Sequence, residues 1–146
     1  MRVLADTGPL VAAANTRDEA HPLAASLVTQ LGRDLVVLDP VVVETDHLLR
    51  ARVDPDTARS FLRSLVIGEH TVAFLTPALL ERATEIDARY ADLDLGVADA
   101  SIMAYAERHT VPILTFDFED FRATRPDGGF WELVVDEARY RESTRG

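Results

Sequence analysis

The stretch RVLADTGPL, residues 2–10, predicts a short buried strand that ends on a carboxylate and then turns into a helix. The residues before Asp6 are apolar on both faces, which is typical of a strand inside a parallel sheet. Pro9 favours a helix start, because proline suits the first helical turn. Asp6 stands where the strand stops, and a charged side chain there is a poor choice for filling a core. We expect the rest of the chain to bring other carboxylates to Asp6.

Strands and helices alternate along most of the chain. Apolar runs predict three further strands, at residues 35–38, 71–75 and 112–116. Proline, glycine and capping residues bound the helices expected between them, at about 9–14, 19–31, 40–50, 54–67, 76–90 and 97–109. This alternation predicts an α/β sandwich around a mostly parallel sheet, in a single domain that covers residues 1–146.

The C-terminal part is expected to be less regular. Turn-forming residues predict a loop over 118–129, and an apolar run predicts a fifth, edge strand at 130–135. Residues 137–146 are rich in arginine, and we expect them to form a frayed, flexible tail.

The composition limits the kinds of function. The 146 residues carry a net charge of −10 and include no cysteine, which excludes disulfides and thiolate zinc sites. No apolar run approaches the roughly 20 residues that span a bilayer, and no signal-peptide pattern is visible, so we expect a cytoplasmic protein without a membrane segment. The negative charge argues against a broad nucleic-acid surface, but it leaves a local basic patch or a metal-bridged contact open.

Three further acids stand where a solvated residue is not expected. Glu44 and Asp99 each lie on the apolar face of their predicted helix. Asp117 directly follows the strand at 112–116, as Asp6 follows the first strand. Open parallel sheets bind ligands beyond the carboxyl ends of their strands, so we expect these four acids to meet at that edge.

Each acid also has a local explanation. Asp6 could cap the next helix, Glu44 could extend to solvent, Asp99 could interact with the dipole of its helix, and Asp117 could be a turn residue. These explanations do not account for four acids in register with one edge. Two carboxylates about 4 Å apart repel by about 4 kcal/mol at an effective dielectric near 20, so such a cluster favours a shared cation. Oxygen ligands select a hard ion, Mg²⁺ or Mn²⁺, and a carboxylate cluster with such an ion is typical of phosphodiester hydrolysis.

The ordered motifs resemble those of the PIN-domain ribonucleases. The matching residues are DTGPL at 6–10, Glu44 in the helix after the second strand, DLGVADAS at 94–101 and LTFD at 114–117. The resemblance covers nearly the whole chain and points to the toxin of a VapBC-type toxin–antitoxin pair. It implies a PIN-like three-layer α/β/α sandwich with a sheet of four to five strands.

The resemblance also implies an activity and its residues. It implies a Mg²⁺- or Mn²⁺-dependent endoribonuclease that is generally a homodimer and is inhibited by a small cognate antitoxin. Carried over by position, the acidic tetrad would be Asp6, Glu44, Asp99 and Asp117. We expect Asp6 and Asp99 to be direct metal ligands, and Glu44 and Asp117 to act through water or to hold a second ion.

Other residues are assigned supporting roles. Thr7 and Thr115 would orient a carboxylate or a water, whereas Asp94 and Asp120 stay outside the predicted set. All fifteen basic residues are arginine, which reflects either a coding bias or a preference for bidentate phosphate contacts. Four of them lie densely on two consecutive predicted helices and are either RNA contacts or a solvated face: Arg50, Arg52, Arg59 and Arg63.

Three alternatives compete with the nuclease. A phosphatase of the haloacid dehalogenase kind also has a nucleophilic aspartate after its first strand, but it needs a second aspartate at the position of Gly8. A phospho-acceptor receiver domain normally places a lysine late in the chain, and this chain has no lysine. A catalytically silent PIN-fold binding module stays open, because sequence alone does not test chemistry.

Overall fold

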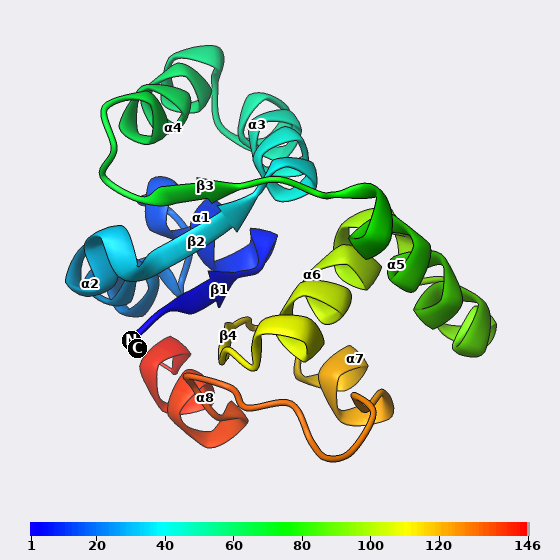
Figure 1. The fold of residues 1–146 in the computed structure, drawn as a ribbon. Coiled ribbons are helices and arrows are strands. Elements are labelled where there is room, and N and C mark those ends of the chain that lie inside the picture. The colour runs from blue at the N-terminus through cyan, green and yellow to red at the C-terminus, as the bar shows by residue number, and fades with distance from the viewer. Residues whose placement is uncertain (146) are drawn as a thin grey trace.

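The computed structural model describes residues 1–145. A four-stranded, all-parallel sheet crosses the middle of the molecule in the order β3-β2-β1-β4 (Figure 1). Leu4 pairs with Val36 on one side and with Ile113 on the other, so the first strand of the chain lies inside the sheet. The strands are β1 (Val3–Ala5), β2 (Leu35–Leu38), β3 (Thr71–Ala73) and β4 (Ile113–Leu114).

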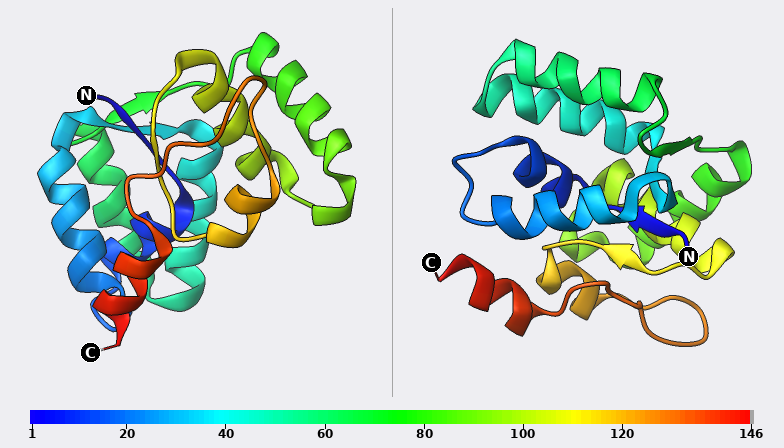
Figure 2. Two further views of the ribbon diagram at one scale, coloured as in Figure 1. Left: turned by 90° about the horizontal axis from the view of Figure 1, so that it is seen from below. Right: turned by 90° about the vertical axis from the view of Figure 1, so that its left-hand side faces the viewer.

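Helices cover both faces of this sheet, which confirms the predicted α/β sandwich. The chain reverses its direction across the sheet after β3, and right-handed crossovers then place the next helices on the opposite face. Figures 1 and 2 show α1 packed with α2 on one side of β1 and α5 packed with α6 on the other, and α3 packs against both α1 and α6. The helices are α1 (Thr7–Ala14), α2 (His21–Leu31), α3 (Asp39–Arg52), α4 (Pro55–Val66), α5 (Pro77–Arg89), α6 (Gly96–His109), α7 (Phe118–Ala123) and α8 (Glu137–Thr144), with short 3₁₀ turns at Gly32–Asp34 and Ala91–Leu93.

The two central strands are apolar and fully buried, because helices pack on both of their faces. All residues of β1 and β2 are buried, and so are Ile113 and Leu114 of β4. The strands are short, so each soon ends at the carboxyl edge of the sheet. The strand order reverses between β1 and β4, and a crevice at such a switch point is where open parallel sheets bind ligands.

The prediction of a loop over 118–129 is wrong for its first half. Residues 118–123 form α7, and Asp117 caps this helix by accepting a hydrogen bond from the backbone N–H of Asp120 at 3.1 Å. Glu119 and Asp120 lie in the first turn and Arg122 in the last, which suits the helix dipole. The sequence therefore contains a helix signal at residues 117–122, but the turn-forming residues after it favour a loop.

The predicted fifth strand at 130–135 is also wrong. Leu133 makes only an isolated parallel bridge to Ile113, with hydrogen bonds from Ile113 N–H to Glu132 O at 2.8 Å and from Val134 N–H to Ile113 O at 3.0 Å. Strand β4 is only two residues long, so residues 130–135 have no further β4 residues with which to form backbone hydrogen bonds.

Residues 137–144 form α8 where a frayed tail is expected from the sequence. Asp136 caps this helix by accepting from the Arg139 N–H at 2.8 Å, and Glu137 pairs with Arg141 one turn later. These local contacts, together with the packing of Tyr140, order the segment. Gly146, the last residue of the expected tail, lies outside the described residues. No helix within residues 1–145 is both long and apolar enough to cross a membrane.

Candidate metal centre

Asp6 is a buried carboxylate held at the end of β1. Its Oδ1 accepts a hydrogen bond from the Thr7 N–H at 2.7 Å, so Asp6 does cap α1. Its Oδ2 accepts from the Thr115 hydroxyl at 2.6 Å, across 109 residues of sequence. Burial raises the pKa of Asp6 above its usual range, the two hydrogen bonds lower it, and the charges of Asp117 and Glu44 raise it further.

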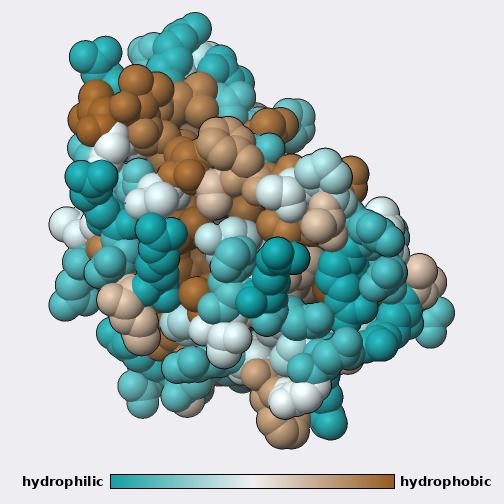
Figure 3. All heavy atoms as spheres, in the orientation of Figure 1, coloured by the Kyte–Doolittle hydropathy of each residue, from teal (hydrophilic) through white to brown (hydrophobic). Residues whose placement is uncertain are grey.

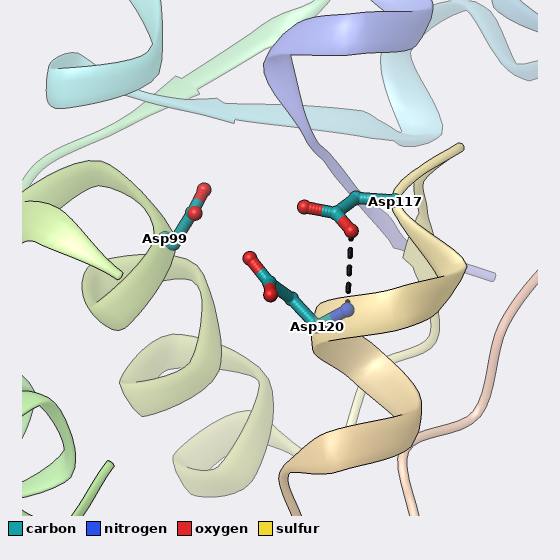
Figure 4. A group of neighbouring side chains, drawn as sticks. All are labelled: Asp99, Asp117 and Asp120. Atoms are coloured by element: carbon teal, nitrogen blue, oxygen red, sulfur yellow. Dashed lines mark hydrogen bonds between the residues drawn. The ribbon is translucent and has the colours of Figure 1, made fainter. Parts of the chain in front are cut away.

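Three other aspartates converge beside this edge of the sheet. Carboxylate oxygens of Asp99, Asp117 and Asp120 all lie within 4.8 Å of one another. Figure 4 shows Asp99 reaching from α6 toward Asp117 and Asp120, which stand at the start of α7. Asp117 is held in place through its backbone as well, because its N–H donates to Thr115 Oγ1 at 3.0 Å. Thr115 therefore links the Asp6 carboxylate to the Asp117 backbone.

The cluster raises the pKa values of its own members. Burial raises the pKa of Asp99 to about 7, and the charges of Asp6, Glu44, Asp117 and Asp120 contribute in that order. Burial also raises the pKa of Asp120 to about 6, with a hydrogen bond and the charge of Asp117 as the next causes. Asp6, Asp99 and Asp120 thus share one electrostatic environment, and their raised pKa values favour the protonated carboxyl in the protein without a cation.

The structure brings together the four acids expected from the sequence and adds Asp120. Glu44 lies on α3, half-buried and near enough for its charge to raise the pKa values of Asp6 and Asp99. Asp120 lies outside the set expected from the sequence, because the expected loop over 118–129 conceals that a helix beginning at residue 118 puts its cap and its third residue on the same side. Asp94 is exposed before α6 and is not one of the three acids whose oxygens lie within 4.8 Å of one another.

The donor set fits a divalent cation. All the candidate ligands are carboxylate oxygens, which hard ions prefer, and the positive charge would relieve the repulsion among them. The Thr7 hydroxyl, buried next to Asp6, has no hydrogen-bond partner among residues 1–145. A polar atom left without a partner in this position is what an ion or its water shell would satisfy.

The sequence matches a family model over most of its length. Residues 3–125 match the PIN domain, which includes every member of the acidic cluster. The chain belongs to the PIN-domain family. The match to the PIN domain removes the basis of the phosphatase and receiver alternatives.

Individual relatives agree with this PIN-domain assignment. The chain is 34% identical over 128 residues to Ribonuclease VapC26 of Mycobacterium tuberculosis, which covers 87% of this chain and 95% of that protein. The PIN domain superposes on VapC20 of Mycobacterium tuberculosis, a sarcin–ricin loop cleaving toxin, with a TM-score of 0.77 at 23% identity over 90% of this chain and 98% of the other. It also superposes on VapBC2 from Rickettsia felis bound to a promoter DNA fragment, with a TM-score of 0.61 at 14% identity over 84% and 92%.

The arginines singled out in the sequence are exposed on α3 and α4 of the PIN domain, and they differ in their partners. Arg50 pairs with Asp46 at 3.0 Å and Arg59 with Asp56 at 3.1 Å, each within one helix. Arg52 and Arg63 make no ion pair with any of residues 1–145. Arg52 lines a polar cleft of about 300 Å³ together with Arg17.

Proposed function

We propose that this PIN domain is an endoribonuclease that uses Mg²⁺ or Mn²⁺ and serves as the toxin of a type II toxin–antitoxin system. The observation that carries the proposal is the convergence of Asp99, Asp117 and Asp120 within 4.8 Å beside the buried Asp6. The 34% identity to Ribonuclease VapC26 supports RNA as the substrate. An RNA substrate in turn supports action in the cytoplasm.

The side chains of this site have two roles: some would bind the ion, and others fix the positions of the carboxylates. Asp99, Asp117 and Asp120 present the oxygens that lie closest together, with Asp6 and Glu44 adding negative charge around them. When bound, the cation would supply an activated water and charge stabilisation for phosphodiester hydrolysis. Thr115 fixes the Asp6 carboxylate and the Asp117 backbone, so both sit ready before an ion binds.

Of the four arginines that the sequence suggests as RNA contacts, we assign contacts with the RNA backbone to Arg52 and Arg63, which lack an acidic partner among the described residues. Arg50 and Arg59 are each neutralised by an aspartate on their own helix. Arg52 lies eight residues beyond Glu44 on α3, about 12 Å along the helix axis, which is within reach of a strand that runs through the acidic centre. Arg63 lies on α4, which packs against α3. Local guanidinium groups of this kind reconcile an RNA substrate with a net charge of −10.

A homodimer is the second part of the proposal. Large apolar side chains are exposed near the carboxyl edge of the sheet, and we call Val43, Phe74, Leu80 and Val97 the apolar face. Figure 3 shows apolar residues exposed over strand β3, and Val66 and Ile67 at the end of α4 are exposed toward the other end of this strand. Exposed apolar patches of this kind mark association surfaces. Leu80→Asp combined with Phe74→Asp is expected to give a monomer by light scattering, whereas a monomeric parent would refute the dimer.

An antitoxin is the third part. A groove of about 400 Å³ between α1, α2 and α4 is lined by Leu10, Ala13, Val28 and Phe61, among others, and these apolar side chains would accept the apolar side of a helix. The antitoxin of such a pair would also place an arginine against the acidic cluster. Co-purification with the small protein encoded next to this chain tests the pairing directly.

RNA cleavage tests the enzymatic proposal. The purified protein should cut RNA in the presence of Mn²⁺ or Mg²⁺ and lose that activity in EDTA. Asp6→Asn and Asp99→Asn should abolish cleavage and relieve growth arrest on induction, while Asp94→Asn, a matched change outside the cluster, should not. Equal cleavage by Asp99→Asn and the parent would refute the site, and a folded parent without metal-dependent cleavage would favour the silent binding module.

A further inference from the structure

Helix α8 lies beyond the part of the chain that matches the PIN family, yet it contacts the segment that carries Asp117. The Tyr140 ring lies 4.7 Å from the Phe116 ring and 5.6 Å from the Phe118 ring, centroid to centroid. Phe116 and Phe118 are the two neighbours of Asp117 in sequence. The Tyr140 side chain of α8 therefore contacts the residues on both sides of Asp117, a candidate metal ligand.

The two faces of this segment have different partners. Thr115 and Asp117 belong to the polar side, where the Thr115 hydroxyl bonds to Asp6 and to the Asp117 N–H. Phe116 and Phe118 belong to the apolar side and meet Tyr140. The aspartate is thus held between hydrogen bonds on one side and aromatic packing on the other.

Further contacts tie α8 to the body of the protein and to α7. Phe116 and Tyr140 pack together against a small cluster of buried alanines from α1, the loop after it and α2: Ala12, Ala20 and Ala24. Glu137 pairs with Arg122, two residues after Asp120, and with Arg141 of its own helix at 2.7 Å. The helix α8 therefore spans from α2 to α7 (Figures 1 and 2).

Helix α7 needs external support. It has only six residues, and an isolated helix of that length is unstable in water. Its capping residue Asp117 and its third residue Asp120 carry charges that repel each other and the rest of the cluster. Phe121 anchors the second half of α7 in the core against Trp131, so Tyr140 supports the first half, where Asp117 and Asp120 lie.

We propose that α8 is a built-in brace for the metal centre, and that Tyr140 is the positioning residue that holds Asp117 and Asp120 in ligand geometry. This inference rests on the proposed function, because it assumes that these acids bind an ion. The Tyr140 ring carries the effect through packing, and its hydroxyl is not required. Removing the ring lets the segment relax, so part of the binding energy of the ion is used to restore the geometry.

Metal titration of four full-length variants tests the brace. Tyr140→Ala is expected to bind Mn²⁺ about fivefold more weakly than the parent by calorimetry, in line with the loss of two aromatic contacts. Tyr140→Phe should bind as the parent does, because it keeps the ring. Arg139→Ala, an exposed neighbour on α8, and Phe61→Leu, a core change on α4, are the controls. Phe61→Leu should lower the melting temperature and leave the Mn²⁺ affinity unchanged.

A second measurement is made without metal. Amide exchange of residues 118–123 should be faster in Tyr140→Ala than in the parent, and unchanged in Tyr140→Phe and Arg139→Ala. Unchanged exchange in Tyr140→Ala would overturn the brace, and so would parent-like Mn²⁺ affinity in a parent that binds the ion. If the parent binds no Mn²⁺, the proposed metal-dependent function fails, while the exchange rates still decide whether α8 holds α7.

Discussion

The Thr115 hydroxyl donates a 2.6 Å hydrogen bond to Asp6 Oδ2, joining the end of β4 to the end of β1. Both residues are buried, so the carboxylate depends on this donor and on the Thr7 N–H for its polar contacts. The bond also ties the first strand of the chain to the last at the point where the strand order reverses. The Thr115 hydroxyl lowers the pKa of the Asp6 carboxyl, and the effect on metal binding can be measured.

Replacing Thr115 with valine should impair metal binding in a pH-dependent way. The Thr115 hydrogen bond lowers the pKa of Asp6, so its loss raises that pKa further and keeps the carboxyl protonated to higher pH. We expect Mn²⁺ affinity to fall about tenfold at pH 6.5 and by less at pH 8.5. Thr115→Ser, which keeps the hydroxyl, should restore most of the affinity. A loss of equal size at both pH values would contradict this account.

The metal-free protein should become less stable as the pH rises from 5 to 8. The pKa values of Asp99, about 7, and Asp120, about 6, are raised above those of an unfolded chain, so the folded state binds more protons in this range. Their contribution is therefore greatest at low pH and is lost as the pH passes these values. Melting temperatures at pH 5.5 and 8 measure the effect.

Two controls define the origin of this pH dependence. Asp54 and Glu137 have lowered pKa values, so their opposite contribution changes only in more acidic solution. Asp99→Asn should flatten the profile and raise the melting temperature at pH 8, whereas Asp94→Asn should leave the slope unchanged. Saturating Mn²⁺ should raise the parent's melting temperature most at pH 8. A parent that grows more stable toward pH 8 without metal would refute the clustered charges.

Asp120 should matter for the ion even though the sequence pattern left it out. Asp120→Asn removes one of the three carboxylates within 4.8 Å, so Mn²⁺ affinity and metal-dependent RNA cleavage should both fall about tenfold or more. Glu119→Gln changes the exposed neighbour in the same turn and should leave both nearly unchanged. Calorimetry and a cleavage assay on the same preparations separate binding from turnover.

The unpaired arginines should dominate RNA binding. Arg52→Gln with Arg63→Gln is expected to weaken RNA binding and to reduce the slope of log affinity against log salt by about 2, one for each lost phosphate contact. Arg50→Gln with Arg59→Gln removes the same charge from residues that already pair with aspartates, so it should have a smaller effect. The catalytically inactive Asp6→Asn background keeps the RNA intact during the titration. Equal effects of the two double variants would refute the distinction.

The sequence was most informative where a local pattern and the topology agree. The apolar run before Asp6 predicts a buried strand, and the parallel α/β alternation then brings Asp117 to the same edge. Glu44 and Asp99 stand out because an acid on the apolar face of a helix needs a reason. These four positions follow from periods of two and 3.6 residues, which a single sequence displays.

The remainder depended on contacts between segments that no local pattern reveals. The turn-forming residues after α7 suggest a loop, so the sequence pattern does not show that Asp117 caps a helix or that Asp120 lies in its first turn. The brace at Tyr140 is a matter of tertiary packing, because its partners Phe116 and Ala24 are distant in sequence. Helix α8 is polar in composition and has no buried residue. The Tyr140 ring and the ion pairs of Glu137 with Arg122 and Arg141 therefore hold it in place.

The sheet order has a consequence for how this protein is made. Because β4 inserts beside β1, the centre unites residue 6 with residues 117 and 120, and a ribosome must synthesise nearly the whole chain before these meet. A nascent or prematurely terminated chain that lacks β4 has Asp6, Glu44 and Asp99 but none of the acids on α7. The acidic centre therefore assembles only after residue 120 has been synthesised and β4 has paired with β1.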